Sequence, residues 1–121
     1  MKRIALAFLV GLTLFGVVKA GETEDIQFEQ YVKVNQENLE DGQSIVADKK
    51  YRVIILTMPI AISHQDATPE VIRVMQREAI KAMRGEEADV RIIKSLKINM
   101  VINYITIDKK IVPIALSYKD L

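Results

Sequence analysis

The apolar residues of this chain fall mostly into short strand-like runs. Residues 51–62 form the longest run, nearly continuous and rich in β-branched side chains. Such a run predicts a central strand covered at least partly on both faces. Pro59 has no backbone N–H, so we expect regular strand pairing to end or bulge there. Residues 26–34 alternate in part and predict another strand. A shorter strand is expected at 44–47, after a polar turn at Asp41-Gly42.

One segment has the period of a helix instead. Thr68 is a good N-cap, Pro69 suits the first helical position, and Gly85 predicts a left-handed residue just after the helix. A second helical pattern covers 86–96 and predicts a short helix or a turn leading back to the sheet. Three- and four-residue spacing gives the first helix one buried stripe, made of Val71, Ile72, Met75, Ala79, Ala82 and Met83.

The last part of the chain predicts a hairpin. Residues 98–104 alternate, 108–110 make a turn, and 111–118 alternate again. Pro113 faces away from the apolar side and indicates an edge strand with at least one unpaired position. Strands, helices and then a hairpin are typical of the α+β class. We expect a small antiparallel sheet of about four strands, with one main helix and a short second helix packed on one face.

The first twenty residues have the pattern of a secretory signal peptide. Two basic residues are followed by an uncharged stretch, 4–18, and by small or short side chains up to Ala20. The sequence therefore predicts a cleavable signal at 1–20 and a single exported domain at 21–121, periplasmic or secreted. The alternative is a retained N-terminal anchor, although the stretch is shorter than the roughly 20 apolar residues that normally span a bilayer.

Removal of the predicted signal peptide changes the net charge of the remaining domain. The whole chain has 17 basic and 16 acidic residues, and three of the basic ones lie in 1–20. The remaining domain has 14 basic against 16 acidic residues, which disfavours nucleic acid as a partner. The chain has no cysteine, so it offers no lipid attachment at a cysteine, no disulfide, no thiolate nucleophile and no zinc–thiolate site.

His64 is the only histidine, and it lies in a loop with Ser63 and Asp66. These three types of residue suggest a catalytic base with partners, but neighbours this close in sequence rarely form a relaxed triad. Turn and capping roles are more typical of such a loop. An enzyme that uses His64 with a distant carboxylate stays open as an alternative.

Acidic residues and methionines offer two further candidate metal sites. The acidic groups (22–25, 37–41 and 86–89) do not match a calcium loop, and we interpret them as solvated charge. Thioethers suit Cu(I), but the spacing of the methionines on a helix stripe and in alternating strands favours core packing. These methionines are Met58, Met75, Met83 and Met100. We expect neither a metal nor a cofactor.

The main candidate binding surface is a basic stripe on the predicted helix. Its four residues are spaced by four, four and three, which places them within about 80° of one helix face. An ordinary solvated face is one interpretation, and a face that binds an anion is the other. The stripe consists of Arg73, Arg77, Lys81 and Arg84.

The sequence thus predicts an exported, non-catalytic binding domain whose partner is another exported protein or an anionic component of the cell envelope. No stable membrane anchor is expected after cleavage. Two other functions remain: a small exported hydrolase that uses His64, and a structural component that assembles through the edge strand at 111–118.

Overall fold

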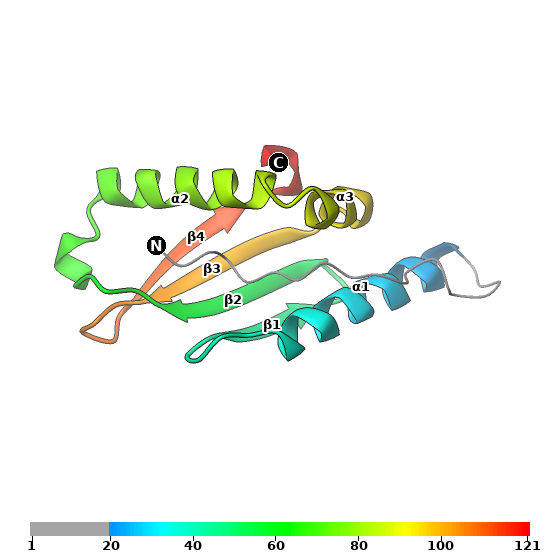
Figure 1. The fold of residues 1–121 in the computed structure, drawn as a ribbon, viewed down its shortest axis with the longest axis horizontal. Coiled ribbons are helices and arrows are strands. Elements are labelled where there is room, and N and C mark those ends of the chain that lie inside the picture. Colours follow the sequence, from blue (N-terminus) through cyan, green and yellow to red (C-terminus); the bar gives the residue numbers. More distant parts are fainter. Residues whose placement is uncertain (1–19) are drawn as a thin grey trace.

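The computed structural model describes residues 20–121 of the chain, with side chains from Thr23 onward, so the predicted signal peptide falls outside it except for Ala20. Three helices and four strands follow one another, together with two short 3₁₀ helices (Figure 1). In chain order they are α1 (Ala20–Glu37), β1 (Ser44–Asp48), β2 (Val53–Pro59), η2 (His64–Asp66), α2 (Pro69–Arg84), α3 (Glu87–Leu96), β3 (Asn99–Ile105), β4 (Ile111–Leu116) and η3 (Tyr118–Asp120).

The four strands form one sheet in the order β1-β2-β3-β4. The α+β class is confirmed, but the prediction of an antiparallel sheet is only partly right, because β2 and β3 are parallel while the outer pairs are antiparallel. The reason lies in the connection: parallel neighbours need a long crossover. Both α2 and α3 lie between β2 and β3 and bring the chain back to the same end of the sheet.

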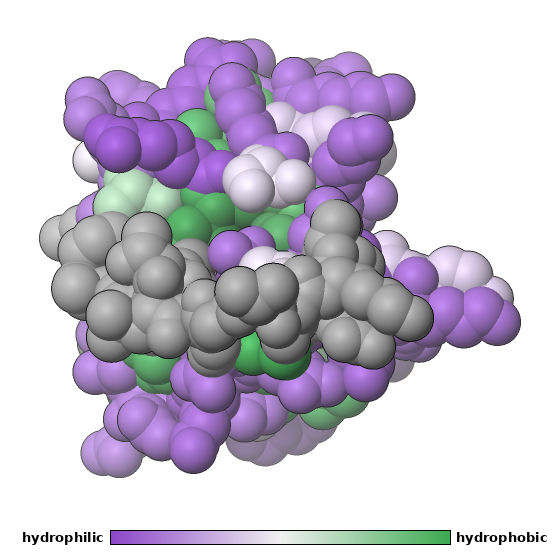
Figure 2. All heavy atoms as spheres, turned by 90° about the vertical axis from the view of Figure 1, so that its right-hand side faces the viewer, coloured by the Kyte–Doolittle hydropathy of each residue, from purple (hydrophilic) through white to green (hydrophobic). Residues whose placement is uncertain are grey.

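One face of the sheet carries the core. The cross-strand row Ile45–Leu56–Ile102–Ile114 is buried, and all three helices add buried side chains to the same cluster. The next row, on the opposite face, is half-buried or exposed; it runs through Val46, Ile55, Val101 and Ala115. β2 is therefore central, with full cover on one face. Viewed from the α3 side, the described surface is mainly hydrophilic, with a smaller hydrophobic area (Figure 2).

The strand predicted at 26–34 is wrong, because this segment belongs to α1. Its buried residues, Phe28, Tyr31, Val32 and Asn35, have three- and four-residue spacing, which is the period of a helix. Aromatic and β-branched side chains have a local preference for strands. In this segment the packing of a helix against the core outweighs that preference. No helix in the described part of the chain is both long and apolar enough to cross a membrane.

The cap of α2 was predicted correctly at its start. The side chain of Thr68 accepts a hydrogen bond from the Val71 N–H at 3.3 Å, and Pro69 is the first helical residue. The predicted left-handed conformation of Gly85 is wrong: its φ is −72°, and its N–H bonds to the Met83 carbonyl. The right-handed turn leads the chain directly into α3. The left-handed residue is Lys97, with φ 54°, at the end of that helix.

A buried hydrogen bond joins α1 to α3. The Tyr31 hydroxyl donates to the Asp89 carboxylate at 2.7 Å, and Asp89 is only 1% exposed. The interpretation of Asp89 as solvated charge is therefore wrong. Asp89 lies in the first turn of α3, where the helix dipole favours a negative charge. Burial, together with the nearby Asp89 charge, raises the pKa of Tyr31 far above its usual range, so Tyr31 remains a donor.

Candidate functional site

The basic stripe lies on the outward face of α2. Arg73, Arg77 and Lys81 are exposed. Arg84 is exposed too, but its guanidinium donates to the Asp120 carbonyl at 2.7 and 3.2 Å and so holds the C-terminal turn. Ion pairs among the described residues form elsewhere, between Lys49 and Glu29 and between Arg52 and both Glu24 and Asp25. Three cations of the stripe are thus open to an external anion.

His64 is exposed in η2, and its neighbours have structural roles. The Ser63 hydroxyl donates to the Asp66 carboxylate at 3.0 Å and caps the turn by accepting from the Asp66 N–H. The His64 backbone N–H donates to Asp108 at 2.8 Å, and the Thr106 hydroxyl donates to the same Asp108 oxygen at 2.6 Å. The Thr106 bond, with the one from His64, lowers the pKa of Asp108. Ser63 and Asp66 thus bond to each other, and the His64 bond to Asp108 uses the backbone.

The acidic groups are not brought together. Asp25 lies within α1, where its carboxylate pairs with Arg52 at 2.7 Å. Across residues 20–121 no group of three histidine, cysteine or acidic side chains is placed to hold a metal ion. The four methionines are buried in the core, as predicted.

Both sheet edges are partly covered. The Gln76 side chain donates to the Ala115 carbonyl of β4 at 3.0 Å, and the Gln36 side chain donates to the Ile45 carbonyl of β1 at 3.3 Å. Antiparallel strands alternate inward and outward backbone groups, so Pro113, two residues before Ala115, also occupies an outward position. The unpaired edge position inferred from Pro113 agrees with this arrangement.

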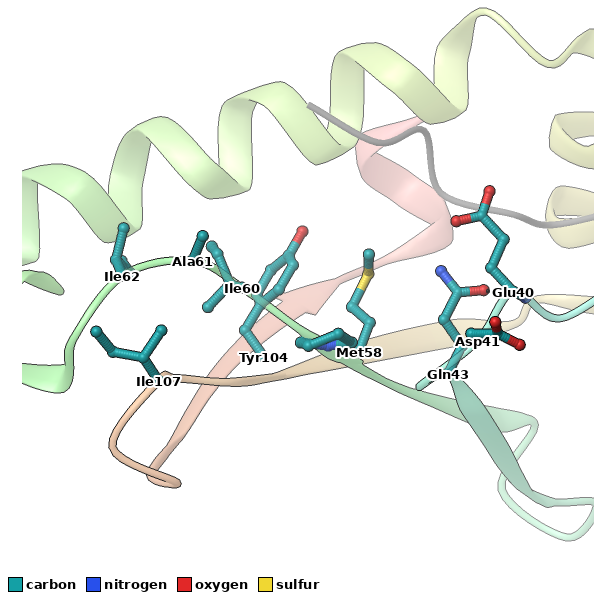
Figure 3. A pocket seen from close by; sticks show the side chains of 10 residues that line it. Glu40, Asp41, Gln43, Met58, Ile60, Ala61, Ile62, Tyr104 and Ile107 are labelled. Carbon is teal, nitrogen blue, oxygen red and sulfur yellow. Dashed lines mark hydrogen bonds between the residues drawn. The ribbon is translucent and has the colours of Figure 1, made fainter.

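A half-open pocket of about 630 Å³ lies at one end of the sheet, where the sequence analysis predicted no site. Met58 of β2 and Tyr104 of β3 are cross-strand partners and form its floor. Figure 3 shows Ile62 and Ile107 at one end of the pocket, with Tyr104 and Met58 rising side by side in the middle. Residues 59–61 also line it. This part of the pocket is apolar except for the Tyr104 hydroxyl.

The opposite end of the pocket is polar. Glu40, Asp41 and Gln43 reach it from the loop between α1 and β1 (Figure 3). The Gln43 side-chain oxygen accepts from the Glu40 N–H at 2.9 Å. Its amide nitrogen is buried and has no hydrogen-bond partner. Burial raises the pKa of Tyr104, so at neutral pH the pocket contains two uncharged donors, the Gln43 amide and the Tyr104 hydroxyl.

Sequence reasoning missed this pocket because residues 51–62 look like one uninterrupted strand. β2 ends at Pro59, and the three apolar residues after it become a wall of the pocket. The proline was the available signal, since it does mark the end of the strand. The residues of the opposite wall are distant in the sequence and share no pattern with 59–62.

Comparison of the chain with protein-family models, with curated proteins and with solved structures gives no match.

Proposed function

We propose that the chain is an exported, non-catalytic binding domain that docks onto a negatively charged partner outside the cytoplasm, through the outward face of α2. The observation that carries this proposal is the row formed by Arg73, Arg77 and Lys81. These side chains are exposed on successive turns and form no ion pair within the described residues. Like charges at this spacing repel weakly, and an anionic partner relieves that repulsion.

The distribution of charge supports a local anion-binding surface. Residues 68–97, which contain α2 and α3, carry seven basic and five acidic side chains. The rest of 21–121 carries seven basic and eleven acidic ones. The domain is therefore acidic in total but basic on this helical layer. Such an arrangement orients an anionic partner toward α2 and repels it elsewhere. It does not suit nucleic acid, which needs a broadly basic surface.

The partner is either another exported protein or an anionic envelope component, and we propose an exported protein. The test starts from full-length protein produced in an exporting bacterium and recovered from the periplasm. Cross-linking identifies the bound protein, and its affinity for the purified domain is then measured at several salt concentrations. Wild type is compared with the double variant Arg77→Glu/Lys81→Glu. The matched control, Lys109→Glu/Lys110→Glu, has the same charge change in the exposed β3–β4 turn.

We expect the stripe variant to bind about thirtyfold more weakly, because each of the two reversals replaces an exposed attraction of about 0.5 kcal/mol by a repulsion of similar size, a loss of about 2 kcal/mol in all. The salt dependence should fall with it, while the control keeps both affinity and salt dependence. Equal losses in the two variants would show a response to net charge alone and would rule out α2 as the docking face.

Export is tested on the same material. The mass of the recovered protein should correspond to a chain that begins at Gly21. A full-length chain found only in washed membranes would support the retained anchor instead.

To test the proposal that the domain is not an enzyme, the recovered protein is assayed against chromogenic esters, phosphoesters and peptides. Hydrolysis that disappears in His64→Ala would favour the enzyme and overturn this proposal.

A further inference from the structure

The pocket at the end of the sheet has a polar atom whose bonding is incomplete. The oxygen of the Gln43 amide is held by the Glu40 N–H, which fixes the orientation of the group. Its nitrogen, buried and without a partner, is left as a donor. Figure 3 shows this nitrogen on the side of Gln43 that faces the pocket. An unsatisfied buried donor is destabilising and uncommon in folded proteins, and an acceptor atom of a ligand would satisfy it.

Charge restricts what that acceptor can be. Glu40 and Asp41 lie at the same end as the Gln43 amide, and none of the described lining residues is basic. A ligand carboxylate or phosphate would be repelled there by Asp41, with no cation among the described lining residues to compensate for the repulsion. An alkylammonium would be attracted to the acidic rim, but it brings only donors and leaves the Gln43 nitrogen unpaired. An uncharged carbonyl satisfies both conditions.

The remainder of the pocket fits an apolar chain. Met58 and Tyr104 form the floor, and Ile62 and Ile107 form the far end (Figure 3). The volume, about 630 Å³, lies within the range of about 300–1,000 Å³ that is typical of small-molecule sites. Ile107 is 64% exposed, so this end is open, and a chain could enter along it.

We propose that this pocket binds a small amphipathic molecule, with its apolar chain between Ile62 and Ile107 and an uncharged ester or amide carbonyl accepting from Gln43. The site shares no residue with the stripe on α2, and the proposal does not depend on the docking function.

The first experiment compares three probes with equal chain length, all below their micelle concentrations: a monoacylglycerol, a fatty acid and an alkylammonium. Binding to the exported protein is measured by calorimetry and by displacement of a polarity-sensitive dye. We expect saturable binding of one monoacylglycerol per chain, tighter than binding of either charged probe. Tighter binding of the fatty acid, or no binding of any probe, would overturn the proposal.

Two variants locate the site. Ile107→Arg introduces a charge at the apolar end, and Val46→Arg makes a comparable change at a residue of similar exposure, 65%, on the uncovered face of the sheet. The first variant should lose monoacylglycerol binding, and the second should keep it. Equal loss in both would mean adsorption on exposed apolar surface rather than binding in the pocket, and would reject the site.

Gln43→Glu tests the head-group contact without removing the loop bond, since a carboxylate oxygen can still accept from the Glu40 N–H. Loss of the donor should weaken monoacylglycerol binding about fivefold, the equivalent of one neutral hydrogen bond. The added charge should strengthen alkylammonium binding. Unchanged selectivity in this variant would refute the Gln43 contact. Displacement of the monoacylglycerol by an apolar peptide amide of higher affinity would assign the pocket to a protein segment instead.

Discussion

The hydrogen bond between Tyr31 and Asp89 is the strongest candidate for a single contact on which the fold depends. Tyr31 is fully buried in α1, and Asp89 is buried at the start of α3. The bond therefore joins two helices that are 58 residues apart in sequence. Replacing Tyr31 with Phe keeps the ring and removes only the hydroxyl, so the change in stability reports mainly on this bond.

The expected cost of Tyr31→Phe is about 2 kcal/mol, because a hydrogen bond to a charged group contributes about 1.5–3 kcal/mol. For a domain of this size, that loss corresponds to a fall in Tm of about 10 °C. Tyr104→Phe is the matched control: Tyr104 is also buried, but its hydroxyl faces the pocket and makes no hydrogen bond within the described residues. Its removal should cost little at neutral pH.

The assay is urea unfolding of both variants and wild type at pH 7, repeated above pH 10. The pKa of Tyr31 is raised in the folded state, so its contribution is complete below the unfolded pKa of about 10 and falls as the pH rises above it. That slope is about 1.4 kcal/mol per pH unit for one proton, and Tyr31→Phe should remove it. Equal losses in the two variants at pH 7, or an unchanged alkaline slope, would refute the role given to the bond.

Three smaller changes test other parts of the fold. Thr68→Ala should destabilise α2 by about 1 kcal/mol through loss of its N-cap, measured by urea unfolding, and restoration by Ser at the same position would confirm the capping role. Gly42→Ala should cost about 1–2 kcal/mol, because Gly42 has φ +81° and its new Cβ would lie 3.3 Å from Pro59; an unchanged Tm would contradict this. The lowered pKa of Asp108 means that its contribution is present above its ordinary pKa and is lost as the pH falls through the folded value. Asp108→Ala, which removes the acceptor as well as the charge, should therefore remove part of the acid sensitivity and speed hydrogen exchange at the His64 N–H. Exchange that stays unchanged would show that Asp108 does not anchor η2.

Local signals predicted the elements whose ends are chemically marked. Thr68 and Pro69 fix the start of α2, and Pro59 fixes the end of β2, because each acts through the backbone of its own neighbours. The β3–β4 hairpin was predicted for the same reason, since its turn and its alternation lie in one continuous segment. In these places the sequence and the structure agree.

Elements that depend on distant contacts were not predicted. Phe28, Tyr31 and Val32 fit a strand by residue type and a helix by spacing, and only packing against the sheet decides between them. The parallel pairing of β2 with β3 follows from where α2 and α3 return the chain, which no local pattern specifies. Asp89 likewise resembles its solvated neighbours, because the hydroxyl that binds it lies on another helix.

The pocket shows that the effect of one local signal, Pro59, depends on distant contacts. Beyond Pro59 the chain still follows β3, since the Ile60 N–H bonds to the Ile105 carbonyl and the Ile107 N–H bonds to the Ile62 carbonyl. These bonds hold the apolar end, and in the polar loop the Gln43 N–H bonds to the Glu40 carbonyl. The two ends are thus positioned by backbone, and the side chains only line the space between them. Substitutions in the lining should therefore change which ligand binds while the pocket itself persists.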